Sequence, residues 1–202
     1  MPLVTKTDGT KFGKTESGTI WLDAKKTSPY AFYQFWLNTA DADVYQFLRF
    51  FTFLSPAEIA DIETQDKAGT GKPQAQRILA EQVTAIVHGQ SAVDAAVRIS
   101  QSLFNDSIGD LTESDLEQLA QDGMPGVQLD RSVVSLVDAL PAAALAKSKT
   151  EARTFVQSGA VSINGVKQAE VTHQFADAER LFGRFTLLKR GKKQFALISW
   201  AE

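Results

Sequence analysis

The residues whose chemistry is easiest to specify stand near the amino terminus, where Lys11 to Thr15 read Lys-Phe-Gly-Lys-Thr. Ammonium and hydroxyl groups donate hydrogen bonds to phosphate, and a glycine lets the backbone approach a ligand closely. The stretch is not a P-loop, because the first glycine of G-x-x-x-x-G-K-[ST] would fall at position 8, which is Asp8. A phosphate-binding loop of another kind and a ligand-free surface turn are both compatible with this composition.

Composition excludes several other kinds of chemistry. The 202 residues include no cysteine, and the two histidines, His88 and His173, lie far apart in the sequence. Thiol nucleophiles, disulfides and thiolate metal sites are therefore excluded, and we expect no metal site. The first residues lack a secretory signal, and no apolar run reaches the roughly 20 residues that a membrane span needs. We expect a cytoplasmic protein with no membrane partner.

Charge is distributed unevenly along the chain. Residues 1–146 hold 11 Lys/Arg and 19 Asp/Glu, whereas residues 147–202 hold 10 and 5, so the tail is basic although the whole chain carries a net charge of -3. Basic clusters supply the sequence-independent part of nucleic-acid affinity. The asymmetry therefore indicates a polyanionic partner for the tail, with a merely solvated basic face as the alternative.

Helix signals dominate after an irregular segment of residues 1–27. Ser28 precedes a proline at a first helical position, and Ser55 with Glu58 forms a capping box, so we expect a helical domain over residues 28–123. The aromatic residues 30, 32, 33, 35 and 36 are of the kind that stacks on bases, but their helical spacing favours the core. Asp41 and Asp43 are candidates for accepting hydrogen bonds from a guanine edge, and helix capping is the alternative for both.

The pattern changes after the segment 123–126, whose glycines and proline mark it as a linker. Ser148 and Glu151 predict a second capping box, and Asn164 with Gly165 predicts a tight hairpin. Two further alternating stretches flank a turn at residues 190–192. We therefore predict an α+β chain in which a small α/β module over residues 124–202 follows the helical domain.

Polar and basic side chains of this module are the candidate RNA contacts, because the capped helix and the hairpins present them together with helix amino-terminal N–H groups. They are Lys147, Lys149, Arg153, Asn164, Lys167, Arg184, Lys189, Arg190, Lys192 and Lys193.

A family resemblance extends over essentially the whole chain. "KFGKT" resembles the tyrosyl variant of the KMSKS loop of class I aminoacyl-tRNA synthetases, and "KTSPYAFYQFWLNTADADVYQFLRFFTFLS", "LAEQVTAIVHG", "DLEQLAQDG" and "RLFGRFTLLKRGKKQF" resemble the continuation in bacterial tyrosyl-tRNA synthetases. Separately, "SKTEARTFVQSGAVSINGVK" resembles the S4-like RNA-binding module. The resemblance implies a KMSKS-type loop segment (1–27), an anticodon-binding helical domain (28–123) and an S4-like domain (124–202).

The resemblance also implies the chemistry of an ATP-dependent tyrosine–tRNA ligase. Lys11 and Lys14 would be catalytic and would bind ATP together with Gly13 and Thr15, by stabilising charge on the departing pyrophosphate. ATP with Mg²⁺, tyrosine and tyrosine tRNA are the implied partners, and the full-length enzyme is expected to be a homodimer. Because no HIGH-type motif or Rossmann-like catalytic domain is recognised, we expect this chain alone to be inactive and to bind no cofactor tightly. The alternative is a free-standing S4-like RNA-binding protein.

Overall fold

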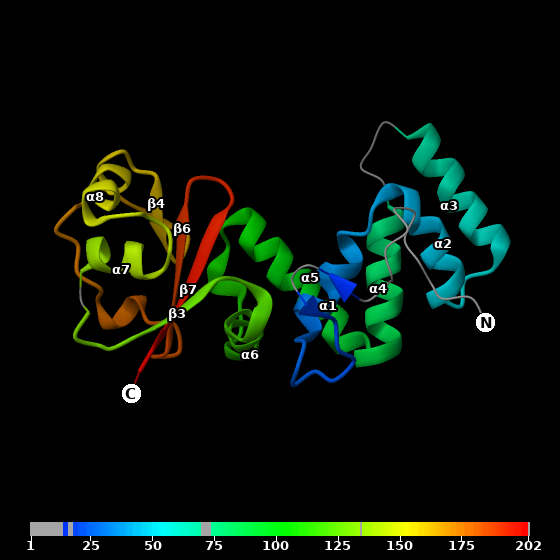
Figure 1. Cartoon of the computed structure of the whole chain (residues 1–202), viewed down its shortest axis with the longest axis horizontal. Helices are drawn as coiled ribbons and strands as arrows, with labels where there is room; N and C mark the ends of the chain where they lie inside the picture. Colours follow the sequence, from blue (N-terminus) through cyan, green and yellow to red (C-terminus); the bar gives the residue numbers. More distant parts are fainter. Residues whose placement is uncertain (1–13, 16–17, 70–73, 134, 202) are drawn as a thin grey trace. The chain divides into compact units, whose positions relative to one another are not determined.

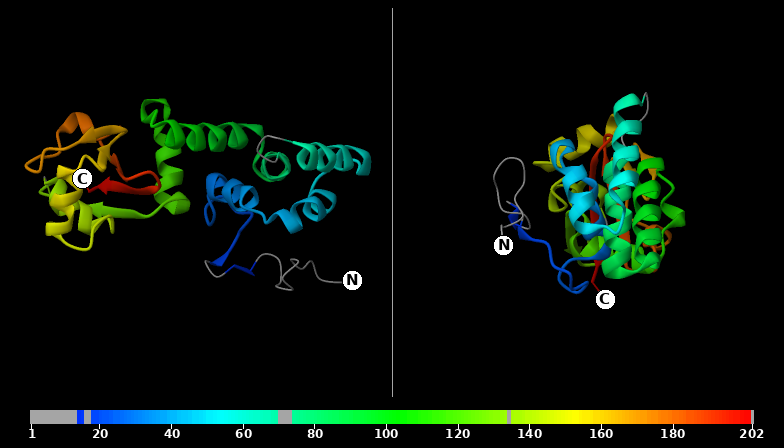
Figure 2. Two further views of the ribbon diagram at one scale, coloured as in Figure 1. Left: turned by 90° about the horizontal axis from the view of Figure 1, so that it is seen from above. Right: turned by 90° about the vertical axis from the view of Figure 1, so that its right-hand side faces the viewer.

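The chain divides into two compact units, Met1–Ala96 and Val97–Glu202. Helix α5 (Gln90–Asn105) begins in the first unit and ends in the second. Figures 1 and 2 show the course of the chain. The computed structural model describes residues 14–15, 18–69, 74–133 and 135–201.

The first unit is mainly helical. An antiparallel pair of two-residue strands precedes the helices (Figure 1). Its elements are β1 (Lys14–Thr15), β2 (Gly18–Thr19), α1 (Pro29–Leu37), α2 (Asp41–Phe51), α3 (Pro56–Ala68) and α4 (Ala75–His88).

Local sequence signals set the ends of these helices. The Ser28 hydroxyl accepts a hydrogen bond from the Ala31 amide at 3.1 Å and caps α1. At the start of α3, Ser55 and Glu58 form the predicted reciprocal capping box. Helix α4 ends at Gly89, whose φ of 85° a residue with a side chain rarely adopts. The predicted helix caps at Ser28 and Ser55 are therefore confirmed.

Aromatic side chains of α1 form much of the core of the first unit. Tyr30, Phe32, Tyr33 and Trp36 are all at most 7% exposed. The Phe32 and Trp36 rings pack edge to face with their centres 6.1 Å apart, an arrangement that aromatic pairs favour. The expectation that this run packs the core is confirmed, and these four rings are not available to stack on bases.

The second unit combines short helices with a mixed sheet of strand order β3-β7-β6-β4-β5 in the described residues. Strand β3 runs parallel to β7, and the other neighbours pair antiparallel. After α5, the elements are η1 (Ile108–Asp110), α6 (Glu113–Gln118), the π-helical turn η2 (Leu119–Gly123), β3 (Gly126–Leu129), α7 (Leu136–Ala142), α8 (Lys149–Gln157), β4 (Val161–Ile163), β5 (Val166–Gln168), η3 (Asp177–Glu179), β6 (Phe185–Arg190) and β7 (Gln194–Trp200).

Helices cover both faces of the central strands. On one face, Leu188 and Ile198 join a core cluster with residues of α7 and α8, which lie beside the strands in Figures 1 and 2. Because side chains alternate along a strand, Leu187 and Leu197 point to the opposite face, where they are also buried. Segment 113–123 covers that face, and η2 contacts β7.

Two sequence expectations need correction here. The segment 123–126 is not only a linker, because Gly126 begins β3 and pairs with Leu197 of β7. At α8, Ser148 caps the helix, but the Glu151 carboxylate accepts from the Lys147 amide instead of the Ser148 amide. The Glu151 carboxylate thus binds the amide one residue before the cap position, and this hydrogen bond fixes the segment of chain that enters α8.

Candidate nucleic-acid interface

The loop assigned to phosphate is only partly described. Lys11 and Gly13 lie outside the described residues. Lys14 and Thr15 form β1, in which Lys14 lies opposite Thr19 in an antiparallel pair with β2. The proposed contacts of these four loop residues with ATP stay predictions.

The two anticodon candidates differ in accessibility. Asp43 is 4% exposed, so its carboxylate is not presented to a guanine edge, which corrects the expectation for this residue. Asp41 is exposed, and its Oδ1 accepts a hydrogen bond from Gln76 Nε2 at 2.6 Å. Ala40 occupies the N-cap position of α2, so neither aspartate is the N-cap residue, although both lie in the first turn. Asp41 stays a prediction.

The amino-terminal turn of α8 presents several cations. The Ser148 hydroxyl accepts from the Glu151 amide at 3.2 Å, which satisfies one of the free N–H groups of the first turn. Lys149 Nζ lies 2.8 Å from Asp138 Oδ1 in a pair whose side chains are 63% and 45% exposed. Lys147 and Arg153 are exposed. Exposed pairs of this kind are weak and exchange readily with a phosphate partner.

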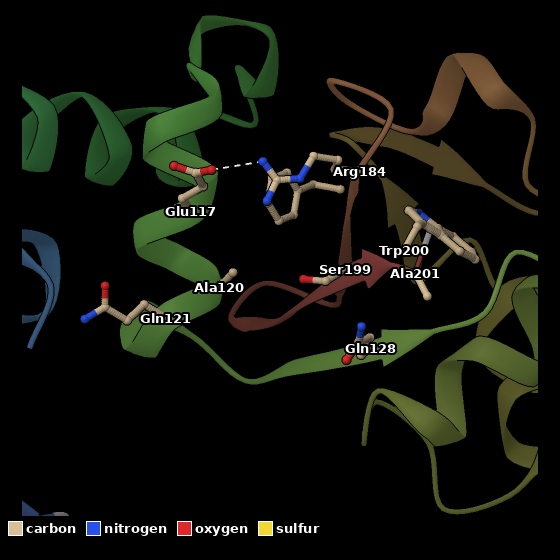
Figure 3. A pocket seen from close by; sticks show the side chains of 9 residues that line it. Glu117, Ala120, Gln121, Gln128, Arg184, Ser199, Trp200 and Ala201 are labelled. Carbon is tan, nitrogen blue, oxygen red and sulfur yellow. Dashed lines mark hydrogen bonds and ion pairs between the residues drawn. The ribbon is translucent and has the colours of Figure 1, made fainter. Parts of the chain in front are cut away.

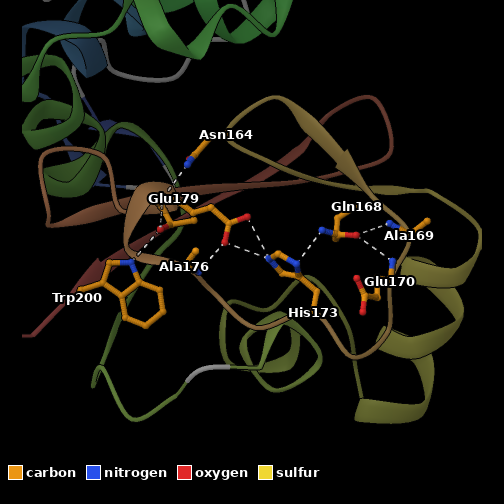
Figure 4. Close-up of polar contacts among 9 residues, drawn as sticks. Asn164, Gln168, Ala169, Glu170, His173, Ala176, Glu179 and Trp200 are labelled. Carbon is orange, nitrogen blue, oxygen red and sulfur yellow. Dashed lines mark hydrogen bonds and ion pairs between the residues drawn. The ribbon is translucent and has the colours of Figure 1, made fainter.

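The side-chain amide of Asn164 forms hydrogen bonds within the fold. Its backbone has a φ of 48°, as the hairpin requires. Its side-chain Nδ2 donates to the Glu179 carbonyl at 2.7 Å (Figure 4). Its Oδ1 accepts from the Leu187 amide at 2.9 Å. The side-chain amide therefore ties the hairpin to β6, and the RNA contact of Asn164 stays a prediction. Lys167, on the next strand, is exposed.

A histidine network next to this hairpin has no counterpart in the sequence expectations (Figure 4). Gln168 Oε1 accepts from the amides of Ala169 and Glu170, so its Nε2 donates to His173 Nδ1 at 2.8 Å. His173 Nε2 then carries the proton that it shares with Glu179 at 3.0 Å. Both ring nitrogens are used in holding a loop. Among the described residues, no group of three His, Cys, Asp or Glu side chains is placed to hold a metal ion.

Arg184 faces carboxylates of α6. Its Nη1 lies 2.7 Å from Glu113 Oε1 and 2.9 Å from Glu117 Oε1, and these hydrogen bonds raise the pKa of Arg184. Figure 3 shows Arg184 pointing toward Glu117 at a hollow of about 470 Å³ that Gln128 and Ser199 also line. Sequence reasoning missed this pairing, because the partners lie 71 and 67 positions away in the chain.

Lys189 is also neutralised within the unit. Its Nζ lies 2.6 Å from Asp106 Oδ1, and its side chain is only 13% exposed. The ammonium also lies 5.2 Å from the centre of the Phe195 ring. Lys189 thus anchors the end of α5 to β6, and little of its charge faces solvent.

Arg190, Lys192 and Lys193 lie at the turn between β6 and β7. The Arg190 guanidinium donates to the Leu145 carbonyl at 2.7 Å and lies 4.6 Å from the centre of the Phe155 ring. Lys192 and Lys193 are exposed. Because Phe155 belongs to α8, the structure brings this turn and α8 to one hollow, and Phe155 is a member that the sequence analysis did not single out.

No helix within the described ranges is long and apolar enough to cross a lipid bilayer.

Two models of known protein families match the chain. Residues 1–105 match the family of class I tRNA synthetases for tryptophan and tyrosine (W and Y), and residues 115–198 match the C-terminal domain of the tyrosine–tRNA ligase SYY-like type. The chain belongs to the class I aminoacyl-tRNA synthetases of this group.

The similar proteins are more specific. The chain is 67% identical over 200 residues to the tyrosine–tRNA ligase of Chromobacterium violaceum and 66% identical to that of Dechloromonas aromatica, in each case over 99% of the chain and 47% of the relative. It therefore resembles the carboxy-terminal region of bacterial tyrosyl-tRNA synthetases and spans about half the length of these relatives.

Solved structures of similar proteins include a tyrosyl-tRNA synthetase C-terminal domain in solution, with 38% identity, a TM-score of 0.39 and coverage of 46% of this chain and 94% of that one. A truncated mitochondrial tyrosyl-tRNA synthetase of Aspergillus nidulans has 36% identity, a TM-score of 0.41 and coverage of 45% and 25%.

Proposed function

We propose that this chain is the tRNA-binding portion of a tyrosine–tRNA ligase, which activates tyrosine with ATP and transfers it to tyrosine tRNA. The observation that carries the proposal is the 67% identity, over 99% of the chain, to a relative of that name. The order of the two family matches supports the same conclusion, since a class I synthetase segment precedes a C-terminal domain of the tyrosine type.

In the proposed reaction, the loop near the amino terminus acts on the phosphates of ATP. Lys14 and Lys11 stabilise the charge that develops on pyrophosphate, while Gly13 and Thr15 bring backbone and hydroxyl donors close. ATP would enter with Mg²⁺. Since the chain spans about half of its relatives' length, we propose that these 202 residues neither activate tyrosine nor hold ATP tightly by themselves.

For the RNA, we propose a division of labour along the chain. Residues 1–27 would supply the ATP-side loop, residues 28–123 would receive the anticodon, with Asp41 as the remaining acidic candidate, and residues 124–202 would bind tRNA with exposed cations. We further propose that the full-length enzyme is a cytoplasmic homodimer. The exposed cations available for phosphate are Lys147, Lys149, Arg153, Lys167, Lys192 and Lys193.

A free-standing S4-like protein is the alternative that the sequence left open. The match of residues 1–105 to class I synthetases argues against it, because an isolated RNA-binding module has no need of that segment.

Binding of the chain to tyrosine tRNA across a salt series tests the proposal. We expect log affinity to fall linearly with log salt concentration, with a slope of about 0.7 to 0.9 per phosphate contacted, and tyrosine tRNA to be preferred to polyuridylate. A slope near zero, or equal affinity for polyuridylate, would contradict specific binding of tRNA.

A further inference from the structure

A hollow of about 580 Å³ lies where α8 meets the turn between β6 and β7. We call it the Phe155 hollow, and its lining residues are Phe155, Ala160, Arg190, Gly191, Lys192, Lys193 and Gln194.

The floor of the Phe155 hollow is flat and fixed. The Arg190 guanidinium is 4.6 Å from the centre of the Phe155 ring and is held by its hydrogen bond to the Leu145 carbonyl. Phe155 in turn packs against the core cluster of the second unit. A cation over an aromatic ring in a fixed position is a platform on which a flat, polarisable group stacks without ordering the side chains first.

The rim of the hollow is cationic. Lys192 and Lys193 are exposed on a turn that begins at Gly191, where φ is 61°, and the Gly191 amide donates to the Ala160 carbonyl at 2.8 Å. None of the lining residues, all of which the structure describes, is a carboxylate. This separates the hollow from the surroundings of Arg184, where Glu113 and Glu117 balance the charge.

We propose that the Phe155 hollow receives one unpaired nucleotide of the bound RNA. The base stacks on the Arg190 guanidinium, which the Phe155 ring supports from below, and the phosphate of the same nucleotide lies against Lys192 and Lys193. A bare phosphate would satisfy the rim but leave the apolar floor without a partner. Unpaired bases that stack on aromatic or arginine planes are the usual targets of single-strand recognition. The inference rests on the proposed function and names the part of the RNA that this face takes.

Four variants of the chain separate stacking from charge. Phe155→Leu keeps apolar volume but removes the ring, and Arg190→Lys keeps the charge but removes the plane. The double variant Lys192→Gln/Lys193→Gln removes only rim charges. Lys67→Gln is the matched control, since Lys67 is an exposed lysine in the other unit, paired with Glu63. Thermal unfolding followed by circular dichroism shows that each variant is folded.

The variants differ in how they change the affinity for tyrosine tRNA. Phe155→Leu and Arg190→Lys should weaken binding about 5- to 160-fold with an unchanged salt slope, as expected for the loss of one stacked base. Lys192→Gln/Lys193→Gln should reduce the slope by about 0.7 to 0.9, because both lysines contact one phosphate. The control should change neither quantity. Affinity of Phe155→Leu equal to that of the unaltered chain would overturn the proposal, as would loss of slope in that variant.

A second measurement tests the hollow without tRNA. Uridine 5′-monophosphate and adenosine 5′-monophosphate should each shift the NMR signals of the Phe155 ring and the Arg190 side chain when titrated into the unaltered chain. Ribose 5-phosphate, which has no base, should not shift them. Equal shifts with ribose 5-phosphate would show a phosphate site only and overturn the nucleotide proposal. If nucleotides bind here but the chain shows no salt-dependent affinity for tRNA, the proposed function fails and the site itself survives.

Discussion

Replacing Arg98 with methionine tests how the second unit is held together. Arg98 Nε and Nη2 donate to the two carboxylate oxygens of Asp115 at 2.9 and 2.8 Å, and Asp115 is 1% exposed. Methionine retains most of the apolar stem but removes both guanidinium donors, while the hydrogen bond from the Thr112 amide to the carboxylate stays. Breaking a buried ion pair costs about 3–5 kcal/mol. Because Arg98 is 39% exposed, solvent screens the pair, and we expect a loss of about 2–3 kcal/mol.

The loss should depend on pH in a defined direction. Burial alone would raise the pKa of Asp115, but hydrogen bonds from Arg98 and Thr112 outweigh it and hold the pKa below 3.8. A carboxyl whose pKa is lower in the folded state stabilises the fold fully above its unfolded pKa and loses that contribution as the pH falls through the folded value. The difference between the two proteins should therefore be largest at neutral pH and shrink below about pH 4.

Hydrogen exchange of the Leu116 amide, which bonds to the Thr112 carbonyl in α6, reports the effect locally. A loss of 2–3 kcal/mol corresponds to about 30- to 160-fold faster exchange at neutral pH. Arg77→Met is the matched control, because Arg77 lies 3.7 Å from Glu81 in an exposed pair. Exchange accelerated no more by Arg98→Met than by the control, or acceleration independent of pH, would refute the reasoning.

Three further outcomes follow from single contacts. Gly165→Ala should destabilise the chain by about 1–3 kcal/mol more than Gly159→Ala in thermal unfolding. A Cβ added at position 165 would lie 2.5 Å from the carbonyl oxygen of Asp106, whereas a Cβ added at position 159 would meet nothing within 4 Å. Equal losses in the two variants would contradict the clash. Glu113→Gln/Glu117→Gln should release the arginine that they neutralise and steepen the salt dependence of tRNA binding by about 0.7 to 0.9, whereas an unchanged slope would show that this arginine does not reach phosphate. In a protein of the relatives' full length, Lys14→Ala should slow tyrosine-dependent ATP–pyrophosphate exchange about 10²- to 10³-fold with tRNA affinity unchanged, and normal exchange would exclude the catalytic role.

Local signals in the sequence predicted local structure well. The caps at Ser28 and Ser55 and the hairpin at Asn164 and Gly165 involve residues within a few positions of one another, so their geometry is encoded in adjacent side chains. The core position of the α1 aromatic residues followed from helical spacing for the same reason.

The missed features depend on contacts between distant parts of the chain. Strand β3 has only four residues, and its partner β7 stands near residue 200, so no local pattern marks it. The ion pairs of Arg184 and Lys189 bridge 67 to 83 positions. A basic residue therefore reads as free charge in the sequence although the fold pairs it with a carboxylate, because no local pattern reveals the partner.

The parallel pairing of β3 with β7 also orders events during synthesis. Gly126–Leu129 leaves the ribosome before the residues that complete its hydrogen bonds, because Gln194–Trp200 follows roughly 70 residues later. Until then β3 exposes an unpaired strand edge, which is the kind of surface that associates with other chains. Helices α7 and α8 and the hairpin of β4 and β5 can form from local contacts in the meantime. The nascent protein therefore gains protection of that edge only when β7 has been made, and association with other chains competes with folding in this interval.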